Sequence, residues 1–311
     1  MSILFTFPGQ GAQRAGMLHA LPRNECVRDT LAEASETLGR DMRSLDSVDA
    51  LRSSVAVQLS LLVAGVAMAR HLIREAGPPD AVAGLSIGAY PAAVMASVLS
   101  YADALRLVER RASLMEAAYP KGYGMVAILG LEQSALVPLV ARVHSPALPV
   151  YIANINAPTQ LVIAGCVAAM SRVASLARSR GAHAVKPVAI SVPSHCDLLD
   201  APAAELARAV AAVPMSTPRL RYFSASRSRV LNAPEHIADD LARNMALPVK
   251  WHDTTVLAHE QGVGLSVEMS PGSVLTHLSA AAFPETVSVA ASDTRVDTLS
   301  VLMARERERA S

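Results

Sequence analysis

The stretch Ala81-Val82-Ala83-Gly84-Leu85-Ser86-Ile87-Gly88 predicts the arrangement on which the rest of the fold is built. Its first three residues form a short apolar run typical of a buried strand, and the residues from Gly88 to Leu99 favour a helix. Between them, the Gly-x-Ser-x-Gly pentapeptide would place Ser86 on a tight strand-to-helix turn, close to backbone amides and the positive end of the helix dipole. We therefore expect Ser86 to be an exposed nucleophile.

The segments before this stretch alternate in the same way. Ile3 to Phe7 is a β-prone run that ends at Pro8-Gly9, which indicates a buried strand leading into a loop. Helical patterns follow at Glu25 to Leu38 and at Val57 to Ala76. Strands alternating with helices indicate a large α/β lobe.

The pattern changes between Gly124 and about Ser191, where shorter strands and helices alternate. Their order, βαββαβ, is the signature of a ferredoxin-like unit. We therefore predict an inserted ferredoxin-like lobe at residues 123–190, with residues 1–122 plus 191–311 forming the large α/β catalytic lobe. The predicted strands are Met125–Leu129, Val150–Ile155, Gln160–Ala164 and Ala184–Ile190, and the predicted helices are Leu136–Val143 and Ala168–Arg180.

Composition and the N-terminus bear on a membrane location. The chain has 311 residues, is 51% hydrophobic and has a mean hydropathy of +0.31. Its most apolar stretch, Val55 to Ala69, is interrupted by Gln58 and Ser60 and is shorter than the ~20 residues that a bilayer requires. We therefore expect a buried helix and no membrane association. The N-terminus lacks the basic start and small-residue cleavage site of a signal peptide, which predicts a cytoplasmic protein.

Charge and cysteine content exclude further classes. The net charge is +1, from 28 basic and 27 acidic residues, and no long basic run is present, so we expect no nucleic-acid partner. The three cysteines, Cys26, Cys166 and Cys196, are odd in number and lack the spacing of a metal site or disulfide framework. Reduced thiols and no bound metal are the expectation.

A serine nucleophile needs a base, which is usually histidine. Nine histidines are present, and His195 stands out because the loop Ser191–His195 follows the last predicted strand of the inserted lobe. Pro193 would stiffen that loop, which could return to the cleft. From the residues alone, an ordinary loop histidine remains an equal alternative.

Four motifs occur in order along the chain, and together they closely resemble the malonyl-CoA:acyl-carrier-protein transacylase family. They are Phe7–Gln13 (FPGQGAQ), Gly84–Gly88 (GLSIG), Val192–Cys196 (VPSHC) and Glu268–Leu275 (EMSPGSVL). The resemblance covers nearly the whole chain. It implies an α/β-hydrolase-like large lobe with an inserted ferredoxin-like lobe, and a ping-pong serine acyltransferase without a permanently bound cofactor.

The resemblance also implies roles for particular residues. Ser86 would attack the thioester carbonyl, and His195 would take its proton and return one to the leaving thiolate. The backbone amides of Gln10 and Ile87 would form the oxyanion hole.

No acidic residue completes a catalytic triad by sequence position. In the family, a backbone carbonyl from a segment resembling Leu247–Trp251 orients the histidine, and we assign that carbonyl to Lys250. Leu247 and Lys250 replace the family's asparagine and glutamine, but a backbone contact survives a change of side chain.

Malonyl selectivity requires a cation for the free carboxylate, and the planar fork of arginine can hold it with two charge-assisted hydrogen bonds. Arg111 takes the family position for this role. Adjacent helical residues point about 100° apart, so only one of Arg110 and Arg111 should face the cleft. Gln58 matches a family glutamine beside the acyl pocket, and Asn154 lies in a resembling Asn-x-Asn-x-Pro run.

Two positions around the nucleophile bear on the subfamily. Leu85 and Ala89 stand where many family members have histidine and glutamate. These departures place the chain off the fatty-acid-synthesis branch, and the combination of Phe5–Arg14 (FTFPGQGAQR) with Gly84–Ala89 (GLSIGA) looks most like the malonyltransferase (epsilon) subunit of biotin-independent malonate decarboxylase. Such a subunit loads malonyl from malonyl-CoA onto the thiol of a CoA-derived prosthetic group on the carrier subunit, so the other decarboxylase subunits are expected partners. A fatty-acid-synthesis malonyl transacylase, a serine thioesterase or hydrolase, and a noncatalytic scaffold remain alternatives.

Overall fold

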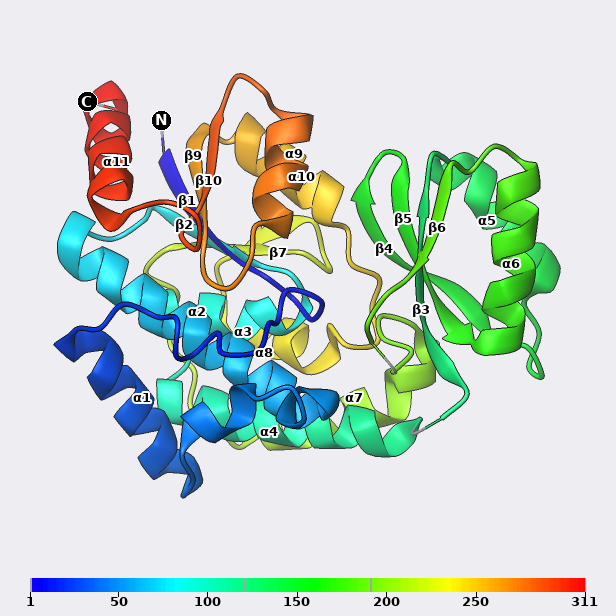
Figure 1. Ribbon diagram of the computed structural model, residues 1–311, viewed down its shortest axis with the longest axis horizontal. Coiled ribbons are helices and arrows are strands. Elements are labelled where there is room, and N and C mark those ends of the chain that lie inside the picture. The colour runs from blue at the N-terminus through cyan, green and yellow to red at the C-terminus, as the bar shows by residue number, and fades with distance from the viewer. Residues whose placement is uncertain (1, 120, 191, 311) are drawn as a thin grey trace.

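A computed structural model of the chain describes residues 2–119, 121–190 and 192–310 (Figure 1). Ser191, the predicted first residue of the second large-lobe segment and of the histidine loop, lies outside the described residues, as do Met1 and Ser311 at the predicted ends of that lobe.

A six-stranded sheet organises the larger part of the molecule, with strand order β10-β9-β1-β2-β7-β8. Neighbouring strands are parallel except for β8, which runs antiparallel to β7. Parallel strands need crossover connections, and helices provide them here. The strands are β1 (Ser2–Phe7), β2 (Ala81–Gly84), β7 (Arg221–Ser224), β8 (Arg229–Leu231), β9 (Val263–Glu268) and β10 (Val287–Ala290).

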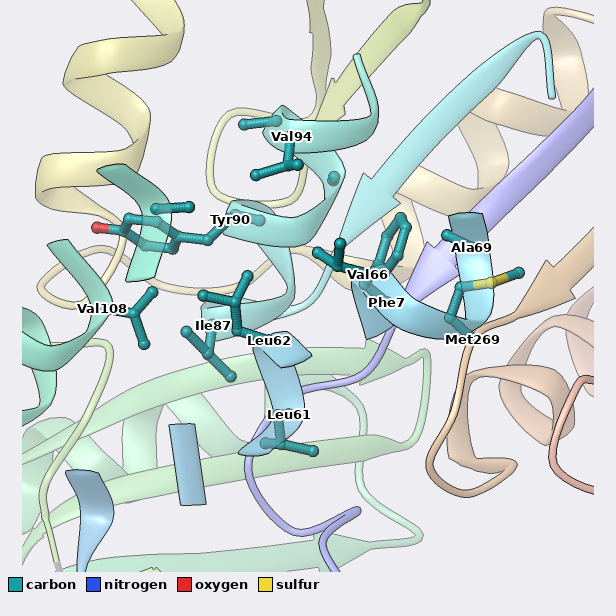
Figure 2. Packing of buried hydrophobic residues seen from close by; sticks show 14 of the residues in the cluster. Phe7, Leu61, Leu62, Val66, Ala69, Ile87, Tyr90, Val94, Val108 and Met269 are labelled. Carbon is teal, nitrogen blue, oxygen red and sulfur yellow. The ribbon is translucent and has the colours of Figure 1, made fainter. Parts of the chain in front are cut away.

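Both faces of the sheet are buried. Successive side chains of a strand point to opposite faces, and those of β1 pack into a hydrophobic cluster on each side. Ile3, Phe5 and Phe7 of β1 belong to the main hydrophobic cluster, whereas Leu4 packs in a second cluster with Trp251. Figure 2 shows Phe7 within the main cluster. The helices of this part are α1 (Glu25–Leu38), α2 (Ser54–Ala76), α3 (Ala89–Met95), α4 (Tyr101–Ala118), α7 (Asp200–Ala211), α8 (Pro234–Arg243), α9 (Trp251–Glu260), α10 (Val274–Ala282) and α11 (Val296–Ala310), with 3-10 turns η1 (Met42–Asp46), η2 (Ala50–Arg52), η3 (Ser86–Gly88) and η4 (Asp197–Leu199).

Helix α2 is the central helix of this part and packs against α1, α3, α4 and α11. It has 23 residues, so it is longer than the apolar stretch on which the sequence prediction was based. Its length and composition would suffice to cross a membrane, but 89% of its most apolar window is buried inside the protein. The expected buried helix is thus present, and its apolar surface is covered by the other helices and the sheet.

A separate four-stranded antiparallel sheet lies beside the large sheet (Figure 1). Its strand order is β4-β5-β3-β6, and the elements follow one another as βαββαβ, as predicted. The two sheets agree in outline with the expected two lobes, and the division at residues 122/123 and 190/191 stays a prediction. The elements are β3 (Tyr123–Leu129), α5 (Gln133–Val143), β4 (Val150–Ala157), β5 (Gln160–Cys166), α6 (Val167–Ser179) and β6 (Ala184–Pro187).

Two predicted elements end earlier than expected. The helix predicted for residues 88–99 is split into η3 and α3 and stops at Met95, after which Ser97 takes a left-handed φ of 60°. The strand predicted to reach Ile190 stops at Pro187; the Val188 amide still donates to the Met125 carbonyl, and the chain then turns, with the Ile190 amide bonded to the Val188 carbonyl.

Candidate active site

The nucleophile lies on the turn between β2 and α3, at the carboxyl end of the sheet. A Cβ atom on Gly84 would come within 2.0 Å of the Gly88 carbonyl carbon, and one on Gly88 within 2.1 Å of the Phe7 carbonyl oxygen. Both glycines are therefore required by close backbone approach. Ser86 itself has a left-handed φ of 58°, a strained conformation that is common for serine on such a turn.

His195 lies against this serine. Its Nε2 is 2.9 Å from Ser86 Oγ, and its Nδ1 is 2.8 Å from the Asn244 carbonyl and 3.1 Å from the Leu247 carbonyl. A carbonyl can only accept a hydrogen bond, so Nδ1 carries the proton and donates. Nε2 of the neutral ring is then left to accept the Ser86 hydroxyl proton, which is the tautomer a general base requires.

The ionisation of His195 fits the same role. Burial, with a smaller contribution from the nearby charge of Arg111, lowers its pKa to about 4, although the hydrogen bonds to the two backbone carbonyls oppose the shift. At neutral pH the ring is uncharged and able to take a proton.

The prediction that the Lys250 carbonyl orients this histidine is wrong. Lys250 caps α9, and its carbonyl accepts hydrogen bonds from the Thr254 amide and hydroxyl. The carbonyls at Nδ1 come instead from Leu247, inside the expected segment, and from Asn244, three residues upstream of it. The sequence offered no signal for Asn244 beyond a polar residue after a helix, which is typical of surface loops.

Arg111 is fully buried and reaches the nucleophile from α4. Its Nη2 donates to Ser86 Oγ over 3.1 Å and to Asn244 Oδ1 over 3.1 Å, and its Nη1 donates to Gln58 Oε1 over 2.6 Å. Burial lowers its pKa to about 10, so it remains charged at neutral pH. Arg110 points away and pairs with Glu205 at the surface, as the 100° offset between helical neighbours predicts.

Gln58 supports this arginine from α2. Besides accepting from Arg111, its Nε2 donates to Gln10 Oε1 over 3.1 Å. Gln58 and Arg111 are both completely buried, and neither is among the residues that line the cavity at Ser86, which Arg111 meets through its hydrogen bond to the serine. Gln58 therefore contacts the expected carboxylate-binding group and the loop of Gln10, and fixes the two relative to each other.

The two residues predicted to form the oxyanion hole lie in the loop after β1 and in the turn that carries Ser86. Gln10 lines the same cavity as Ser86, in the loop after β1. The amide of Ile87 lies in the first turn of η3, where backbone N–H groups have no intrahelical acceptor. The assignment of the Gln10 and Ile87 amides as oxyanion donors stays a prediction.

A cavity of about 240 Å³ opens onto the nucleophile, between strands of the small sheet on one side and the loops after β1 and β2 and the start of α10 on the other. Asn154 of β4 lies in its wall, is 6% exposed, and its Oδ1 has no hydrogen-bond partner. A larger surface hollow of about 790 Å³ near the start of α1 contains none of these groups. The cavity is lined by Pro8, Gly9, Gln10, Gly11, Ala12, Leu85, Ser86, Met125, Ala127, Asn154, Asn156, Gln160, Val162, Val188, Ile190, Ser194, His195, Val274 and Leu275.

Comparisons with known proteins agree with this geometry. A family model described as acyl transferase domain matches residues 4–310. The malonyl CoA-acyl carrier protein transacylase of Haemophilus influenzae is 36% identical over 281 residues, which are 88% of this chain and 89% of the relative. The chain belongs to the malonyl-CoA:acyl-carrier-protein transacylase family, and it is an acyltransferase.

Solved structures of this family share the whole fold. An acyl-carrier-protein S-malonyltransferase from Burkholderia pseudomallei has a TM-score of 0.92 and 34% identity, covering 97% of this chain and 100% of that chain. A malonyl-transacylase solved in complex with a type II PKS acyl-carrier protein has a TM-score of 0.90 and 35% identity, covering 99% of this chain and 100% of that chain. The mixed α/β architecture, with a large parallel sheet and a small antiparallel sheet, is therefore the one found in transacylases of this family.

The buried histidine leads to a pH prediction. Because neutral His195 is the base, labelling of Ser86 by an uncharged fluorophosphonate should stay constant from pH 8 down to about 5 and fall only as the pH approaches about 4. The pKa of His195 in the folded protein lies below the unfolded value of about 6.5, so the unfolded state binds the proton more tightly. The free energy of unfolding should therefore decrease as the pH falls from about 6.5 towards 4. Labelling rates measured by intact mass over this range check the prediction; half-maximal labelling near pH 6.5 would contradict it.

Proposed function

We propose that this acyltransferase moves malonyl from malonyl-CoA, through an ester on Ser86, to the thiol of a carrier protein's CoA-derived prosthetic group. The observation that carries the proposal is the buried guanidinium of Arg111, 3.1 Å from the nucleophile. Within the described part of the chain, no carboxylate forms an ion pair with it. A substrate carboxylate a few bonds from the reacting carbonyl would supply that partner, and malonyl has one where acetyl does not.

The first half of the reaction loads the enzyme. Ser86 Oγ attacks the thioester carbonyl while its proton passes to His195 Nε2. The amides of Gln10 and Ile87 stabilise the tetrahedral oxyanion. When the carbon–sulfur bond breaks, the proton on His195 goes to the leaving thiolate of CoA. The second half reverses these steps, with the carrier thiol attacking the malonyl ester and Ser86 leaving.

The identity of the carrier is the finer part of the proposal. The named relatives are malonyl CoA-acyl carrier protein transacylases, which favours a fatty-acid type of carrier. Leu85 and Ala89, at positions where many relatives have histidine and glutamate, favour the carrier subunit of malonate decarboxylase. Leu85 lines the cleft, so its apolar side chain contributes to the surface that the entering prosthetic group meets.

A competition experiment tests both parts. The enzyme is given labelled malonyl-CoA and equal amounts of a fatty-acid acyl-carrier protein and a malonate decarboxylase carrier, and the label is followed by intact mass. Label on the serine and then on a carrier is expected, and the favoured carrier identifies the pathway. Release of free malonate as the main product, with both carriers present, would contradict the transfer reaction and identify the protein as a thioester hydrolase.

A further inference from the structure

A buried carboxylate on α8 takes no part in the steps above. Asp240 is 1% exposed, and its two oxygens accept hydrogen bonds from three hydroxyl groups. Tyr222 Oη donates to Oδ2 over 3.1 Å, Ser224 Oγ donates to Oδ1 over 2.7 Å, and Ser226 Oγ also donates to Oδ1. Burial raises the pKa of Asp240, and the hydroxyl donors oppose that rise. Keeping a carboxyl group away from water is costly, so this cluster needs an explanation.

The helix end that Asp240 anchors contacts the three central groups of the active site. The Asn244 amide donates to the Asp240 carbonyl over 2.9 Å. The Asn244 carbonyl accepts from His195 Nδ1, and its Oδ1 accepts from Arg111 Nη2. Its Nδ2 donates to the Ser86 carbonyl over 3.3 Å. One residue at the end of α8 therefore touches the nucleophile, the base and the buried arginine.

Two of the hydroxyl donors to Asp240, Tyr222 and Ser224, lie on β7, the strand beside β2, and the third, Ser226, follows in the turn after β7. Ser224 of β7 lies opposite Gly84 of β2, two residues before Ser86. Tyr90, in the helix after the nucleophile, donates to the Leu241 carbonyl over 2.9 Å. The end of α8 is thus bonded to elements on both sides of the Ser86 turn.

We propose that Asp240 is a positioning residue, which ties the end of α8 to β7 and so holds Asn244 against both His195 and Arg111. Through the first contact it fixes the histidine tautomer, and through the second it fixes the direction of the guanidinium. Because one anchor supports both contacts, its loss reduces the rate of acylation and the preference for malonyl together. The second of these readouts rests on the proposed function, whereas the first does not.

The test compares Asp240→Ala with Asp240→Asn. The alanine variant removes the acceptor for all three hydroxyls, and we expect kcat for malonyl transfer to fall about 10- to 100-fold, since small displacements of catalytic groups cost this much. The malonyl-to-acetyl ratio should fall as well. The asparagine variant keeps an oxygen for Ser224 and Ser226 and should recover most of both. Asp239→Asn is the matched control, because Asp239 lies one residue away and pairs with Arg227 at the surface.

Labelling of Ser86 by an uncharged fluorophosphonate separates this proposal from the proposed function, because it needs the base but no malonyl group. Slow labelling of Asp240→Ala would support the positioning role even if the wild-type protein transferred another acyl group. If the alanine variant does not fold, Tyr222→Phe and Ser226→Ala each remove one donor with little change of volume, and each should slow labelling severalfold. Folded variants that label and transfer at the wild-type rate, with the wild-type malonyl-to-acetyl ratio, would overturn the proposal and leave Asp240 a merely structural residue.

Discussion

Replacing Ser86 with alanine should abolish the acyl-enzyme and lower malonyl transfer by roughly 10³-fold or more, because loss of a nucleophile removes the covalent route that the other groups serve. The histidine would keep both carbonyl contacts at Nδ1 but would have no hydroxyl to deprotonate. Incubation with malonyl-CoA followed by intact mass should show a malonyl adduct on the wild-type protein and none on Ser86→Ala, and a thiol-release assay should give the change in kcat.

Ser60→Ala is a suitable control, since Ser60 is completely buried and its hydroxyl has no hydrogen-bond partner among the described residues, so the same substitution there removes none of the contacts of the active site. Its rate should be close to that of the wild type. Transfer and adduct formation that survive in Ser86→Ala would remove the nucleophile assignment and favour a noncatalytic scaffold role.

The nucleophile turn could be predicted from sequence because its requirements are local. The glycines at 84 and 88 are needed by atoms within or next to the turn, and the strand before it is a short apolar run. The order of helices and strands in the smaller lobe was predictable for a similar reason, since these elements follow one another between Tyr123 and Pro187. Element ends were less predictable, as the early stop of α3 at Met95 shows.

The groups that orient the site could not be predicted in this way. Asn244 and Asp240 act through contacts with residues far away in sequence, 49 residues from Asn244 to His195 and 18 from Asp240 to Tyr222. Neither residue belongs to a motif, and both are ordinary polar residues on an amphipathic helix or just after it. Lys250 was assigned from a resembling segment, but the start of α9 uses its carbonyl for the helix's own first turn. Only the packed structure determines which carbonyls face the histidine.

Arg111→Ala should reduce malonyl transfer far more than acetyl transfer. Only malonyl carries a distal carboxylate for the guanidinium, and truncating one partner of a buried, hydrogen-bonded charge pair costs about 2 to 5 kcal/mol. At 1.36 kcal/mol for each factor of ten, the malonyl-to-acetyl ratio of kcat/KM should fall by about 30-fold to several thousand-fold. Arg111→Lys keeps the charge but loses the planar fork, so it should lie between the alanine variant and the wild type.

The ratio is the decisive quantity, because the alanine variant also loses stability. Removing a fully buried arginine leaves a cavity and deprives Gln58 and Asn244 of their donor, which lowers the amount of folded enzyme for either substrate equally. Arg110→Ala is the matched control on the same helix, since Arg110 pairs with Glu205 at the surface and its loss should leave the ratio unchanged. Equal losses of malonyl and acetyl transfer in Arg111→Ala would mean that the guanidinium serves Ser86, to which it also donates, and does not select the substrate.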